Sequence, residues 1–117
     1  LRAPGRLMLP PPLRPLPGPN APGRVAAEER LRAAGVTPYA WGNGPGDTYA
    51  AHEHGYEKLL VCADGSITFL VGSDQTPVTL SAGDGLVLPA GTRHAAVVGP
   101  EGCTCLEGHR AGWAESP

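Results

Sequence analysis

The amino-acid sequence predicts an all-β protein, built as a barrel or a sandwich of short strands. Two observations support this prediction. From residue 37 onward, short apolar segments alternate with turn sequences rich in glycine, proline and aspartate. No helical pattern follows Gly35, so the sequence lacks the alternation of strands and helices that builds a parallel sheet. The length of 117 residues suits a single domain with one core.

The first 36 residues have a different composition from the rest. Residues 1–22 are rich in proline, which favours an extended arm. This arm is either disordered or lies along the domain through its apolar residues 7–9. Residues 23–36 predict one short helix, with Asn20 as a candidate N-cap and Gly35 as the residue that ends it.

Eight short strands are expected after this helix. They span residues 37–41, 49–54, 58–63, 66–72, 78–80, 86–88, 94–98 and 103–107. Turn chemistry separates them, including "ADG" at 63–65 and "GPEG" at 99–102. The β-domain is therefore expected to span 37–111, with a C-terminal tail at 112–117.

Charge and hydropathy argue against several classes of partner. The formal net charge is −2 and the isoelectric point is near 6.1, whereas nucleic-acid and anionic-membrane partners require a basic patch. No apolar stretch approaches the ~20 residues that span a bilayer. We expect a cytoplasmic protein that binds a small molecule and neither nucleic acid nor membrane.

The chain has three cysteines, an odd number without C-x-x-C spacing. This predicts neither a disulfide framework nor a common zinc site. We expect Cys62, Cys103 and Cys105 to be small buried apolar residues.

Three histidines are spaced like metal ligands. His52 and His54 lie two residues apart, so on a strand their side chains share one face. His94 lies where a later strand would begin, and a facing strand would bring its imidazole to the same ion. Neutral imidazole is a good ligand for zinc, copper, iron and nickel.

The segment around the first two histidines resembles the first motif of the cupin superfamily. That motif is a glycine, five residues, His-x-His, three or four residues, a glutamate, six residues and a glycine. The matching residues are Gly46, His52, His54 and Gly65.

The segment around the third histidine resembles the second cupin motif. That motif is a glycine, five residues, Pro-x-Gly, two residues, a histidine, three residues and an asparagine. The matching residues are Gly83, Pro89, Gly91 and His94, and Val98 replaces the asparagine. The resemblance covers about residues 37–110.

This resemblance implies a double-stranded β-helix, or jelly-roll barrel, with the metal inside it. The cofactor implied is one divalent transition metal per chain. The sequence does not distinguish iron, manganese, copper, nickel, cobalt and zinc. The ligands implied are His52, His54 and His94.

One departure from the first motif concerns the metal site directly. Where the family has a ligand glutamate, this chain has Lys58, its sole lysine. Counting from His52 places Lys58 and Tyr56 on the histidine face, toward the interior. Lys58 either directs its ammonium group at an anionic ligand or extends it to the barrel rim, and we favour the rim.

Three other polar residues are candidates for a role near the metal. Glu57 should point away from the interior and would become a ligand only through a bulge. Glu107 is either a partner of a ligand histidine or, as we prefer, a charge at the barrel mouth. His109 is either a neighbour of the metal site or exposed. The interior is expected to be lined by leucine, valine, isoleucine and alanine, because the chain has few aromatic residues.

Three functions are compatible with such a site. The first is a metal-dependent dioxygenase that acts on a small enol, phenol or thiol, because three neutral ligands leave coordination positions open. The second is a non-catalytic module that binds or senses a small molecule. The third is a non-redox isomerase or lyase, which ranks last because it needs a general base in the barrel.

The predicted sheet has apolar residues on both faces, as in Leu59 and Val61 alternating with Leu60 and Cys62. One face fills the barrel and the other requires a cover. The cover is either the N-terminal arm with its helix or a second subunit, and a homodimer is slightly favoured.

Overall fold

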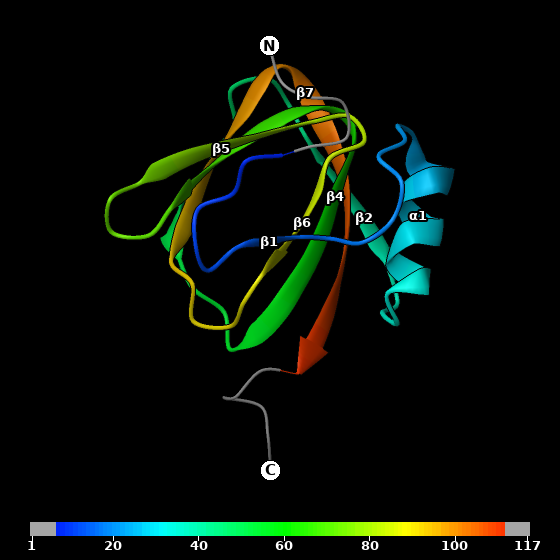
Figure 1. Cartoon of the computed structure of the whole chain (residues 1–117). Helices are drawn as coiled ribbons and strands as arrows, with labels where there is room; N and C mark the ends of the chain where they lie inside the picture. Colours follow the sequence, from blue (N-terminus) through cyan, green and yellow to red (C-terminus); the bar gives the residue numbers. More distant parts are fainter. Residues whose placement is uncertain (1–6, 112–117) are drawn as a thin grey trace.

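Two long antiparallel strands, β4 (Tyr56–Val71) and β7 (His94–Ala111), pair along most of their length and organise the fold (Figure 1). The structure is a computed structural model that describes residues 7–111. Its remaining strands are β1 (Arg14–Pro15), β2 (Tyr39–Asn43), β3 (Thr48–His52), β5 (Thr76–Ser81) and β6 (Gly85–Leu88). The helix α1 (Arg24–Ala33) packs on β4 and β7. None of the helices described in residues 7–111 is long and apolar enough to cross a membrane.

β4 and β7 each contribute to two layers. One half of the pair is flanked by β6 and β2, in the order β1-β6-β4-β7-β2, and the other half by β5 and β3. The pairing of β4 with β7 shifts register twice between residues 62 and 67, at the point where β4 passes from its β6 partner to its β5 partner. The result is the predicted all-β fold, an antiparallel double-stranded β-helix.

Two of the predicted turns are wrong. The "ADG" segment at 63–65 lies inside β4, and the "GPEG" segment at 99–102 lies inside β7. Gly65 has φ of +73° and Gly102 has φ of +78°, values that glycine adopts readily. Here these glycines form bulges that bend a continuous strand, so residues typical of turns do not reverse the chain.

The inner-core cluster fills the space between the two layers. Its buried members are Leu13, Leu60, Cys62, Ile67, Phe69, Val71, Val78, Leu80, Leu86, Leu88, Ala96, Val98, Cys103 and Cys105. The three cysteines are free and buried, as expected. Most of this cluster is aliphatic, so the predicted lining is correct for this part of the interior.

A second apolar cluster lies on the outer face of the barrel, beneath α1. Leu59, Val61 and Leu106 project there from β4 and β7. Leu16 from the arm and Leu31 from α1 pack against them. The arm and helix therefore cover this face, which is one of the two covers expected. A homodimer stays a prediction.

The arm is held along the domain by a buried arginine. The guanidinium of Arg30 donates hydrogen bonds to the carbonyl oxygens of Leu16 at 2.6 Å, Pro17 at 3.3 Å and Gly83 at 2.9 Å. In the predicted contact segment 7–9, Leu7 and Leu9 pack on the inner core and Met8 is 82% exposed.

The predicted start of the helix needs one correction. The N-cap residue is Gly23, which makes no side-chain capping bond, and the Asn20 amide instead donates to Asp84 at 3.4 Å. Asn20 lies too far from the first turn because the helix begins only at Arg24. Gly35, with φ of +89°, follows the end of α1 as predicted.

Candidate metal centre and cavity

Three histidines from neighbouring elements meet at one end of the barrel. His52 ends β3 and His94 begins β7, and the two are direct partners in the antiparallel register. His54 lies in the connection to β4, where its carbonyl oxygen accepts the Gly91 N–H at 2.8 Å. One ring nitrogen from each histidine lies within 4.8 Å of the other two. That spacing is close to what two metal–nitrogen bonds of ~2.0–2.1 Å can span.

Backbone hydrogen bonds leave the Nε2 atoms of this cluster available to an ion. His52 Nδ1 lies 2.7 Å from the Ala50 carbonyl oxygen, and His94 Nδ1 lies 2.9 Å from that of Thr92. Since a carbonyl oxygen only accepts, both Nδ1 atoms carry the proton. Nε2 of His54 and of His94 is buried and has no hydrogen-bond partner among the described residues. Two buried ring nitrogens without a hydrogen-bond partner, in a group of three histidines, fit a bound transition metal.

The surroundings keep these rings neutral, as coordination requires. The pKa of His94 is lowered to about 4, mainly by burial and also by the charge of Lys58, against the opposing hydrogen bond to Thr92. Burial also lowers the pKa of His54, with Lys58 and His52 acting in the same direction. At neutral pH both imidazoles can therefore offer a lone pair.

The histidine cluster opens into a cavity of about 310 Å³. Its walls are formed by Tyr39, Trp41, Tyr49, His52, His54, Tyr56, Lys58, Ile67, Phe69, His94, Ala96 and Glu107. Five of the six aromatic residues of the chain are in this set. The expectation of an aliphatic lining is therefore wrong for the cavity, because the few aromatic residues concentrate there.

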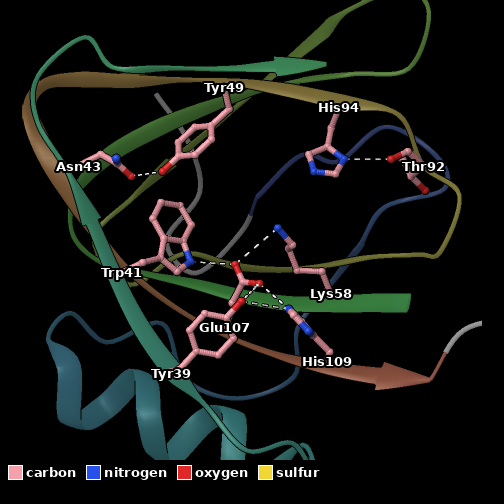
Figure 2. Close-up of polar contacts among 9 residues, drawn as sticks. All are labelled: Tyr39, Trp41, Asn43, Tyr49, Lys58, Thr92, His94, Glu107 and His109. Atoms are coloured by element: carbon pink, nitrogen blue, oxygen red, sulfur yellow. Dashed lines mark hydrogen bonds and ion pairs between the residues drawn. The ribbon is translucent and has the colours of Figure 1, made fainter. Parts of the chain in front are cut away.

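Glu107 lies at the centre of a buried hydrogen-bond network, shown in Figure 2. Its Oε2 accepts from the Tyr39 hydroxyl at 2.7 Å and from His109 Nε2 at 2.5 Å. Its Oε1 accepts from Trp41 Nε1 at 2.8 Å. Only 3% of Glu107 is exposed, so the preferred placement of this charge at the barrel mouth is wrong. The partners that make its burial possible come from β2 and from the end of β7.

Lys58 completes this network from β4. Its ammonium nitrogen lies 3.5 Å from Glu107 Oε1, and the residue is 9% exposed. In Figure 2 the ammonium group points into the space between Glu107 and His94. The favoured prediction that Lys58 reaches the rim is wrong, because the buried carboxylate of Glu107 holds the ammonium group inside.

The remaining candidates lie where strand alternation places them. Glu57 points away from the cavity and pairs with Arg14 and Arg110, each at 2.8 Å. Tyr56 lines the cavity, with its ring stacked between His54 and His109 at centroid distances of 4.6 and 3.9 Å.

Tyr39 is one of the wall residues that the sequence did not identify. Its spacing of two from Trp41 in a predicted strand was the signal that could have identified it.

The chain belongs to the cupin family, because the family model for the cupin domain matches residues 43–108, more than half of the sequence. The matched residues include His52, His54 and His94. A search of curated protein sequences gave no match.

Solved structures with the same fold support this assignment. A cupin superfamily protein from Desulfitobacterium hafniense is 19% identical, with a TM-score of 0.54 over 62% of this chain and 63% of that one. A conserved protein with a double-stranded β-helix domain from Klebsiella pneumoniae is 24% identical, with a TM-score of 0.57 over 65% of this chain and 63% of that one. A DMSP lyase from Ruegeria pomeroyi is 24% identical, with a TM-score of 0.59 over 70% of this chain and 41% of that one. The matched region is less than two thirds of each of these relatives, and at this identity the likeness concerns the fold alone.

Proposed function

We propose that this protein is a metal-dependent cupin enzyme that acts on a small organic molecule. The reaction we favour is that of a dioxygenase. The observation that supports it most is the group of three imidazoles with converging ring nitrogens on the wall of a cavity. His52, His54 and His94 would hold one divalent transition metal. A bound redox-active metal would supply positions at which a chelating substrate and dioxygen bind side by side.

The protein residues around the ion would perform three tasks. The carbonyl oxygens of Ala50 and Thr92 fix the tautomers of two ligand histidines. The aromatic walls exclude water and hold a flat ligand. Lys58 offers positive charge to the ligand from inside the cavity. A structural metal site would need none of this open, lined space, which is why we favour catalysis over a purely structural ion.

A non-redox lyase or isomerase is the second candidate. This reaction class needs a general base, and the sequence offers few candidates for one inside the barrel. Lys58 and Glu107 both line the cavity and are the candidates there. The similar fold of a DMSP lyase is compatible with this reaction class. Glu107 is a weak base because the pKa of its carboxyl group lies below the ordinary value. Burial would raise that pKa, but Lys58, His109, Tyr39 and Trp41 together lower it. Lys58 would therefore have to act as the base.

The experiment that separates these functions loads the protein with iron, manganese, copper, nickel, cobalt or zinc in turn. Each form is offered a panel of small enols, phenols, thiols and carboxylates while oxygen uptake and substrate loss are followed together. A dioxygenase consumes oxygen and substrate with a redox-active metal, and His94→Ala abolishes both. Substrate loss without oxygen uptake supports the lyase or isomerase. Tight binding without turnover leaves a binding module and contradicts the enzymatic proposal.

A further inference from the structure

We infer that the ligand of this cavity is a small planar organic anion whose charged group is bound by Lys58. The inference deepens the proposed function, because it rests on the same cavity being the substrate site. It depends on the charge balance of the cavity wall and on which hydrogen-bonding groups the protein has already used.

Glu107 has no capacity left for a ligand. A carboxylate offers about four acceptor positions. Oε2 of Glu107 has Tyr39 and His109 as partners, and Oε1 has Trp41 and Lys58. The one buried acid on the wall is thus saturated by the protein, so it cannot select a cationic ligand.

Lys58, in contrast, keeps hydrogen-bond donors that the protein does not use. An ammonium group has three N–H donors. Within residues 7–111 this group pairs with Glu107 at 3.5 Å, whereas strong ammonium–carboxylate bonds measure ~2.7–2.9 Å. Donors thus remain for a ligand inside a largely buried space, where a charge-assisted bond is stronger than in water.

The saturation of Glu107 also positions Lys58. If Glu107 were free, Lys58 would close on it and neutralise it in a tight pair. Trp41 already donates to Oε1, the oxygen that Lys58 faces, and Tyr39 and His109 hold the other. The ammonium group therefore lies near the carboxylate while its remaining donors face the cavity.

The walls limit the shape of the anion. The cavity of about 310 Å³ is at the lower end of the ~300–1,000 Å³ range of ligand pockets. Rings of Trp41, Tyr49 and Phe69 form apolar walls on which a flat body packs well. A planar carboxylate or enolate satisfies both the walls and Lys58.

The test compares benzoate with benzamide, two probes of the same shape that differ in charge. Binding to the metal-loaded protein and to the chelator-treated protein is measured by calorimetry and by tryptophan fluorescence. We expect benzoate to bind roughly tenfold more tightly than benzamide. Lys58→Met should remove this preference and Lys58→Arg should retain most of it. Arg24→Met, which removes the same charge from the exposed start of α1, should leave the preference unchanged.

Two results would overturn the inference. One is equal affinity for the two probes in the wild-type protein, or no binding of either at millimolar concentration. The other is a preference for benzoate that survives in Lys58→Met. The wild-type comparison stands even if a Lys58 variant does not fold. Metal content measured in the same samples separates the two proposals, because a benzoate preference in a protein that takes up no metal even when metal is offered supports the anion site and contradicts the metal-dependent function.

Discussion

At the scale of single residues, the candidate metal centre depends on which ring nitrogen each histidine leaves free. Two backbone carbonyl groups, those of Ala50 and Thr92, take the Nδ1 protons of His52 and His94. The Nε2 lone pairs of these two rings are then available to an ion. The sequence spacing predicted which residues converge, but it could not predict the tautomers, since these depend on local backbone geometry.

Glu107 is the residue whose removal should damage the fold most within the cavity wall. Glu107→Ala leaves the Tyr39 hydroxyl, the Trp41 N–H and the Lys58 ammonium group buried without their acceptor. We expect the free energy of unfolding to fall by ~3–5 kcal/mol, measured by urea denaturation at pH 7.

The matched control for this prediction is Glu57→Ala. Glu57 also has two ion-pair partners, Arg14 and Arg110, but all three side chains are partly exposed. Its replacement should cost less than ~1 kcal/mol. An equal loss of stability in the two variants would mean that burial of the Glu107 network adds nothing.

Glu107 should also contribute to the loss of stability in acid. Its folded-state pKa lies below the ordinary value of 4.5, because its hydrogen-bonding and charged neighbours outweigh the effect of burial. A lowered acid pKa stabilises the folded state above pH 4.5, and this contribution disappears as the pH falls through the folded-state pKa. Glu107→Gln should therefore flatten the decline of the free energy of unfolding between about pH 5 and 3. The same acid slope in this variant and the wild type would contradict the assigned shift.

At the scale of elements, the two glycine bulges determine how the long strands change layer. Gly65 has φ of +73°, and a Cβ there would lie 2.0 Å from the carbonyl oxygen of Gly102. The pairing of β4 with β7 allows no room for this atom. The bulge thus needs glycine for two reasons, its backbone conformation and the close approach of the partner strand.

Gly65→Ala should consequently destabilise the protein by about 3 kcal/mol or more. Gly72→Ala is the control, because Gly72 has a similar φ of +78° and open space around its Cβ position. The control should cost only ~1–2 kcal/mol. Thermal unfolding followed by circular dichroism compares the two, and equal losses would show that the contact with Gly102 is unimportant.

Strand alternation predicted correctly which side chains point into the barrel. It predicted less well where each strand ends. Counting by two from His52 placed Tyr56 and Lys58 in the interior and Glu57 outside, as the structure does. The turn sequences at 63–65 and 99–102 were misread because the same residues serve reversals and bulges. Only the pairing partner distinguishes those two uses, and it lies some 40 residues away in the chain.

At the scale of the whole molecule, the chain covers its own outer apolar face and concentrates its aromatic residues around one cavity. The cover consists of α1 and the N-terminal arm, to which Arg30 donates hydrogen bonds. The network of Glu107 with Lys58 joins the neighbouring strands β4, β7 and β2. It could not be predicted from sequence, because it depends on the register of β4 against β7, which the bulges shift.

The measurement that tests the central claim most directly is elemental analysis of the purified protein and three variants. If His52, His54 and His94 form the metal centre, the wild type holds about one transition metal per chain and raises its melting temperature on binding it. His52→Ala and His94→Ala should lose the metal. His109→Ala, which removes a histidine from the Glu107 network and not from the cluster, should retain it. No metal in the wild type even after reconstitution, or full metal content in both His52→Ala and His94→Ala, would contradict the three-histidine site.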